Sequence, residues 1–156
     1  MAEHHALQEA IAWELNPLAL PDNDIGGPYV DLASGTRFVF HLPSLRVGPP
    51  HRRYRAVDRS FFVRAYLTAC AELLGVSDRF EAVDADLVEF KLPPESAAVV
   101  RAANLPAFVP SFREPSRWFE ATEWIKPGGW LVVQLGREHV DVFEGFGKEL
   151  SRRGWR

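Results

Sequence analysis

The sequence predicts a single α/β domain in which helices cover both faces of a mainly parallel sheet. Short apolar segments alternate along the chain with longer segments of helical period, and neither an internal repeat nor a low-complexity linker interrupts them. The chain has 156 residues, of which 47% are hydrophobic and 25% are charged, as is typical of one globular domain with a buried core.

The N-terminal residues 1–27 are expected to form a helix and a loop ahead of a core over 28–156. Apolar residues recur at every fourth position within 3–15, which predicts an amphipathic helix that would lie over the functional edge of the sheet. Pro17 ends this helix, because a proline disfavours the helical conformation of the residue before it.

The core is expected to contain five strands and four helices. The strands are predicted over 29–32, 54–57, 80–83, 97–101 and 130–135. The helices are predicted over 37–46, 61–76, 114–124 and 137–153. Pro43 limits the first helix to a short one. The second helix begins after the capping residue Ser60, and Gly75 is suited to end it.

Charge and hydropathy argue against nucleic acid and membranes as partners. The net charge of −3 gives no broad basic face. No apolar run approaches the ~20 residues of a membrane span, and the N-terminus has no signal-peptide core, so a cytoplasmic protein is expected. The arginine-rich, lysine-poor composition is typical of a GC-rich bacterial genome. Cys70 is the single cysteine and no histidine has metal-ligand spacing, so neither a disulfide nor a metal site is predicted.

Acidic residues accompany the first three predicted strands. Asp31 lies within the first strand, Asp58 ends the second, and Asp84 and Asp86 follow the third. Ligands of parallel α/β sheets bind at the carboxyl ends of the strands, where these side chains would gather. The backbone N–H groups of 34–36 can receive an anion there. Together these features predict a nucleoside ligand.

The two outer acids suit different parts of such a ligand. Asp58 can accept two hydrogen bonds from ribose hydroxyls. Asp86 can accept from an exocyclic amine such as that of adenine, because an ionised carboxylate is acceptor-only. A dinucleotide is disfavoured, because residues 31–37 read D-L-A-S-G-T-R and lack the second and third glycines of its fingerprint.

Four segments within 28–156 resemble motifs of the class I S-adenosylmethionine-dependent methyltransferases. VDLASGTR is similar to the glycine-rich first motif, YRAVDRS to the second, FEAVDADLVEF to the third, and WIKPGGWLVV to the segment leading into the fifth strand. The resemblance implies a Rossmann-like three-layer sandwich with strand order 3-2-1-4-5 and S-adenosylmethionine as cofactor. It implies cofactor contacts at Asp31, Ala33, Ser34, Gly35, Asp58, Arg59, Asp86, Leu87 and Asn104.

In this family arrangement the methionine part lies over Ser34 and Gly35, the ribose against Asp58 and the adenine near Asp86, with Asp84 as the alternative. Such enzymes work largely by aligning the nucleophile with the activated methyl group. No catalytic residue is identified. The compact chain leaves no room for an inserted substrate domain, so a small-molecule acceptor is expected.

Three departures from the family pattern bear on activity. Arg37 stands where the family has its third glycine. Its side chain would place a positive charge against the cofactor's sulfonium, or turn outward, or pair with the methionine carboxylate. The chain ends at SRRGWR, where the family usually continues into an antiparallel strand pair. The fifth strand would then be an exposed edge, which a homodimer or a partner strand would cover.

The third departure follows the fourth strand. Asn104-Leu105-Pro106 resembles the N-L-P-Y motif of nitrogen methyltransferases, although Ala107 separates it from Phe108; the alternative is a loop that lines the cofactor pocket. Two functions therefore stay open: methyl transfer, and a methyltransferase-like domain that serves in binding or assembly without catalysis.

Overall fold

The structure is a computed structural model that describes residues 25–103, 105, 109–134 and 140–154. The helix expected over 3–15 lies outside the described residues, and so do Asn104 and the residues 106–108.

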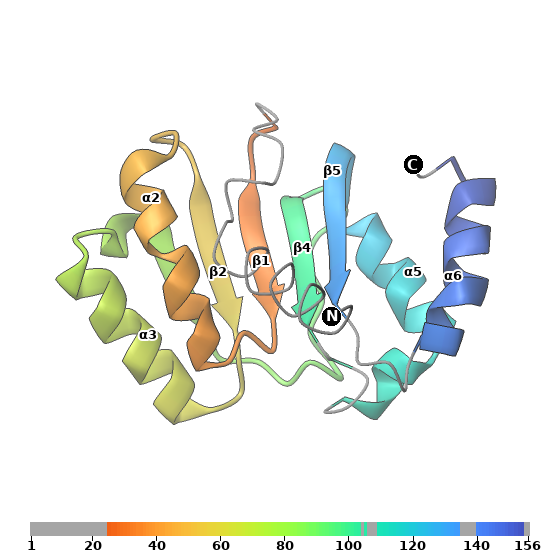
Figure 1. The fold of residues 1–156 in the computed structure, drawn as a ribbon, viewed down its shortest axis with the longest axis horizontal. Helices are drawn as coiled ribbons and strands as arrows, with labels where there is room; N and C mark the ends of the chain where they lie inside the picture. The colour runs from red at the N-terminus through yellow and green to blue at the C-terminus, as the bar shows by residue number, and fades with distance from the viewer. Residues whose placement is uncertain (1–24, 104, 106–108, 135–139, 155–156) are drawn as a thin grey trace, which may run out of the picture.

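The described chain forms one parallel sheet of five strands (Figure 1). The strands are β1 (Pro28–Leu32), β2 (Arg53–Val57), β3 (Phe80–Val83), β4 (Ala97–Ala103) and β5 (Ile125–Gln134). Their order is β3-β2-β1-β4-β5 and every neighbouring pair is parallel, so the predicted class and strand order are confirmed. All carboxyl ends therefore meet at one edge, the lower edge in Figure 1.

Helices pack on both faces of this sheet. The helical segments are η2 (Thr36–His41), α2 (Pro43–Val47), α3 (Phe61–Leu73), η3 (Ser77–Arg79), η4 (Pro110–Arg113), α5 (Pro115–Glu123) and α6 (Val140–Arg152). One core cluster joins η2, α2 and α3 to β1 and β2, and a second joins α5 and α6 to the other face. Because strand side chains alternate between these clusters, the domain is a three-layer sandwich.

Pro43 divides the predicted helix over 37–46. A 3-10 helix ends at His41, and a single α-helical turn begins with Pro43 at its first position, where the missing proline N–H is tolerated. The next helix, α3, starts as predicted: the Ser60 hydroxyl accepts a hydrogen bond from the Val63 amide at 3.4 Å. Gly75 follows the helix with φ +67°, a left-handed conformation that glycine adopts without strain.

Strand β5 begins at Ile125 rather than at Trp130, because Ile125 pairs with Ala97 ahead of a register shift in β4. The Pro127-Gly128-Gly129 turn thus lies inside the strand. A Cβ at Gly129 would stand 2.6 Å from the carbonyl oxygen of Ala98, so only glycine lets the two strands approach so closely. Within the described residues no helix is long and apolar enough to cross a membrane.

Candidate functional site

A pocket of about 350 Å³ opens at the carboxyl edge of the sheet. It is lined by Ala33, Asp58, Arg59, Asp86, Leu87, Val88, Val109 and Pro110. These residues come from the exits of β1, β2 and β3 and from the segment after β4. Ala33, Asp58, Arg59, Asp86 and Leu87 belong to the predicted set, so segments far apart in sequence meet here as the strand pattern predicts. Its volume is within the range of small-molecule sites.

Asp58 connects the first-motif loop to the start of α3. Its Oδ2 accepts a hydrogen bond from the Gly35 amide at 3.0 Å, and its Oδ1 accepts from the Ser60 amide at 2.8 Å. A carboxylate has about four lone-pair sites, so each oxygen keeps capacity for a further donor. The half-buried carboxylate is therefore held in place by the backbone and can still accept hydrogen bonds from a ligand in the pocket.

The glycine-poor loop contains two residues with a positive φ. Ala33 has φ +53°, and Gly35 has φ +56° with ψ −179°, a combination that is essentially restricted to glycine. A left-handed alanine costs roughly 1–2 kcal/mol relative to a right-handed one. Between them, Ser34 is 7% exposed, and its hydroxyl has no hydrogen-bond partner among the described residues. The loop thus has a strained turn and a buried hydroxyl with unused hydrogen-bonding capacity.

Arg37, which stands where the family has its third glycine, has an exposed side chain in the first turn of η2. It is absent from the pocket lining. Which of the three alternatives holds when a cofactor is bound stays a prediction.

Asp84 and Asp86 have different surroundings, which the sequence alone did not separate. Asp84 is 69% exposed and accepts from the Arg64 guanidinium at 2.9 Å. Asp86 lines the pocket; its Oδ1 accepts from the Val88 amide at 2.9 Å, and its Oδ2 lies 3.5 Å from Arg59 Nη1. Asp86 is thus the one of the two acids that lines the pocket.

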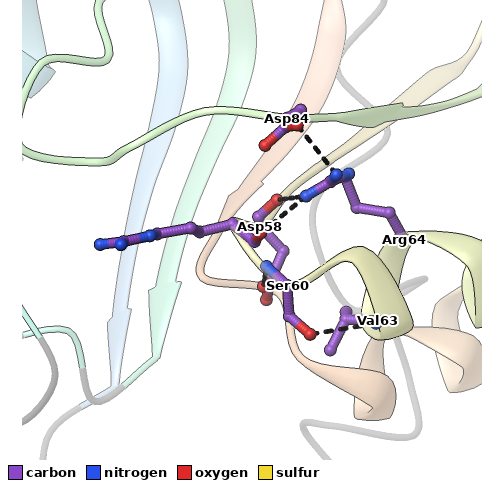
Figure 2. Close-up of polar contacts among 6 residues, drawn as sticks. Asp58, Ser60, Val63, Arg64 and Asp84 are labelled. Atoms are coloured by element: carbon purple, nitrogen blue, oxygen red, sulfur yellow. Dashed lines mark hydrogen bonds and ion pairs between the residues drawn. The ribbon is translucent and has the colours of Figure 1, made fainter.

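Arg64 is a functional-site neighbour that sequence reasoning missed (Figure 2). From the first turn of α3, its Nη1 donates to the carbonyls of Asp58 at 3.0 Å and Arg59 at 2.8 Å, while its Nη2 donates to Asp84. The side chain is only 16% exposed. Its position one helical turn after the cap Ser60 was the available signal, since such a side chain can reach back to the preceding turn.

Arg117 of α5 binds the segment after β3 that carries Asp86 and Leu87. Its Nη2 donates to the carbonyls of Leu87 at 2.9 Å and Phe90 at 2.7 Å. The buried guanidinium also lies over the rings of Phe112 and Trp124, at 5.2 and 5.5 Å from their centroids. One side chain thus connects the segment that carries Asp86 and Leu87 to the helix behind it.

Asp31 lies beneath the loop rather than in the pocket lining. Its carboxylate is fully buried, and Oδ2 accepts from Arg101 Nη1 of the neighbouring strand β4 at 2.8 Å. His41 packs nearby, where burial and then the charge of Arg101 lower its pKa to about 4. Burial and then the charge of Asp31 raise the pKa of Tyr29 well above its ordinary value. The buried Asp31–Arg101 pair thus lies inside the domain, on the strands that lead to the loop.

The described part of the chain contains no candidate metal site: no group of three or more histidine, cysteine, aspartate or glutamate side chains there could hold an ion. The predicted contact at Asn104 lies outside the described residues, although its neighbour Leu105 is buried.

Comparisons with solved structures agree with the fold. No protein-family profile and no curated protein matches the sequence. Among solved structures, a methyltransferase from Geobacter sulfurreducens in complex with S-adenosyl-L-homocysteine has 20% identity and a TM-score of 0.60, over 77% of this chain and 46% of the other. The geranyl diphosphate C-methyltransferase of Streptomyces coelicolor has 17% identity and a TM-score of 0.63, over 94% and 56%.

A methyltransferase from Thiobacillus denitrificans, also in complex with S-adenosyl-L-homocysteine, has 17% identity and a TM-score of 0.55, over 69% of this chain and 41% of the other. The chain spans about half the length of the solved structures it resembles. Strand order, layer arrangement and these likenesses agree. The chain therefore has the fold of the class I S-adenosylmethionine-dependent methyltransferases.

Proposed function

We propose that the chain is the cofactor-binding core of an S-adenosylmethionine-dependent methyltransferase that acts on a small-molecule acceptor. The observation that carries this proposal is the carboxyl-edge pocket, which Ala33, Asp58 and Asp86 line together from the exits of β1, β2 and β3. The neighbours crystallised with S-adenosyl-L-homocysteine support the choice of ligand.

The residues present fit such a cofactor. Asp58 would accept from the ribose hydroxyls, and Asp86 from the adenine amine. The buried Ser34 hydroxyl lacks a partner among the described residues and would gain one from the methionine part. Arg59, which is 82% exposed at the pocket mouth, would pack over the adenine ring.

When bound, the cofactor supplies an activated methyl group on its sulfonium. The chain's own contribution is to bind and orient: Asp58 and the loop before η2 hold one end of the ligand, and the 86–88 segment holds the other. Alignment of this kind accounts for much of the rate in reactions between two bound partners. Asp31, buried against Arg101, would act by supporting the loop.

Calorimetry with S-adenosylmethionine and S-adenosylhomocysteine tests the proposal. We expect binding of both, weakened about 5-fold to 100-fold by Asp58→Asn, because the amide leaves ligand hydroxyls without one acceptor. Asp78→Asn is the matched control, since Asp78 is exposed in η3 at the opposite end of β3. Absence of binding at millimolar ligand would refute the proposal and favour the non-catalytic alternative.

A homodimer through the β5 edge stays a prediction. Strand β5 ends the sheet order within the described residues, and its Trp130 is 40% exposed. Sedimentation equilibrium tests this prediction, and a monomer at 100-fold varied concentrations would contradict it. Location in the cytoplasm likewise stays a prediction.

A further inference from the structure

We propose that Arg64 is a positioning residue of the cofactor pocket. It holds the turn between β2 and α3, on which Asp58 and Arg59 stand, and it keeps Asp84 out of the pocket (Figure 2). This role rests on the proposed function, because it is defined by the ligand that Asp58 would bind.

The first part of the role is a main-chain clamp. Nη1 of Arg64 donates to two consecutive carbonyls, those of Asp58 at 3.0 Å and Arg59 at 2.8 Å. Hydrogen bonds from a guanidinium are about twice as strong as neutral ones, and two from one planar group restrict the orientation of the peptide between them. The turn is therefore held in the conformation in which the Asp58 carboxylate reaches both Gly35 and Ser60.

The second part of the role concerns Asp84 and Asp86, of which Arg64 binds the first. Arg64 Nη2 donates to Asp84 Oδ2, which turns that carboxylate toward α3 (Figure 2). Asp86, two residues further along, lines the pocket instead. Since a carboxylate that faces a largely covered guanidinium is directed away from other donors, Arg64 decides which of the two acids meets the adenine amine.

Joining β2 to β3 does not require Arg64. The strands pair through four registered residues, from Tyr54–Phe80 to Val57–Val83. A second ion pair, Arg55 with Glu81, also connects them, at 2.6 Å and away from the pocket. Arg55 is therefore a matched control: it is also an arginine in a short ion pair with an acid, but its partner Glu81 is registered with it inside the strand pair and neither residue lines the carboxyl-edge pocket.

The experiment compares wild type, Arg64→Met, Arg64→Lys and Arg55→Met by calorimetry with S-adenosylhomocysteine. We expect Arg64→Met to weaken binding by about 10-fold or more, with partial recovery in Arg64→Lys, because charge-assisted hydrogen bonds are lost and then partly restored. Arg55→Met should stay within about twofold of wild type. Asp84→Asn should change affinity by less than about threefold, because both carbonyl contacts remain.

A double-mutant cycle separates positioning from general destabilisation. If Arg64 acts through Asp58, Asp58→Asn should cost less affinity in the Arg64→Met background than in wild type, whereas it should be additive with Arg55→Met. Amide hydrogen exchange without ligand gives a second readout, in which Gly35 and Ser60 should exchange faster in Arg64→Met and unchanged in Arg55→Met.

The outcomes distinguish the two proposals. No binding by wild type overturns the proposed function, while the exchange experiment still reports on the clamp. Binding by wild type with equal affinities for Arg64→Met and Arg55→Met overturns the role of Arg64. If Arg64→Met does not fold, Arg64→Lys carries the same comparison, because lysine keeps the charge but cannot donate to both carbonyls and to Asp84 in one planar geometry. A large loss of S-adenosylhomocysteine affinity in Asp84→Asn alone would overturn the claim that Asp86, and not Asp84, contacts the ligand.

Discussion

Lowering the pH should destabilise the protein through His41, which lies beneath the first-motif loop. Its side chain is 3% exposed and packs against Phe38 and Tyr29, with ring centroids 5.4 and 6.1 Å away. Burial, and then the charge of Arg101, lower its pKa from 6.5 to about 4. Nδ1 has no hydrogen-bond partner among the described residues, so nothing there compensates a proton. Protonation is thus disfavoured in the folded state.

The sign follows from proton binding. Below pH 6.5 the unfolded chain protonates this histidine, whereas the folded chain does so only near pH 4, so the unfolded state binds more protons between these values. The contribution of uncharged His41 to the free energy of unfolding is fully present above pH 6.5 and is lost as the pH falls toward 4. At about 1.4 kcal/mol for each pH unit, the loss reaches about 2.5 kcal/mol at pH 4.5.

Urea unfolding of wild type and His41→Phe at pH 7.5 and pH 4.5 measures this effect. Phenylalanine keeps the aromatic packing and cannot titrate, so carboxylate contributions cancel in the comparison. We expect wild type to lose about 2.5 kcal/mol more than the variant between the two pH values. His51→Phe, at an exposed position in the loop before β2, should behave as wild type. If wild type and His41→Phe lose equal free energy of unfolding between pH 7.5 and pH 4.5, the reasoning is refuted.

Two further predictions concern stability. Arg117→Gln should lower the free energy of unfolding by about 2–3 kcal/mol, because the carbonyls of the 87–90 segment lose charged donors; an unfolding midpoint unchanged in urea would contradict this. Gly129→Ala should cost at least about 2 kcal/mol, because its Cβ would stand 2.6 Å from the Ala98 carbonyl oxygen. Gly147→Ala in α6, where a Cβ meets nothing within 4 Å, is the control and should be neutral or stabilising; equal thermal shifts for the two alanines would contradict the steric argument.

Local chemistry was enough to predict most of the fold. Alternating strand and helix patterns, the cap at Ser60 and the glycine at 75 act over a few residues, so they can be recognised in sequence. Parallel connections bring strand ends to one edge, which is why Asp58 and Asp86 were expected to meet there. The family motifs then supplied the strand order, which the structure confirms.

Only the tertiary structure decided how those residues are used. The sequence favoured Asp86 over Asp84 only by its fit to a family motif, whereas in the structure Arg64, twenty residues before Asp84, separates the two acids by binding Asp84. The burial of Asp31 depends on Arg101, seventy residues away on β4. Ion pairs and hydrogen bonds between distant residues depend on geometry in three dimensions, and no local period or motif records it. The exposure of Arg37 in the first turn of η2 was likewise left open by the sequence.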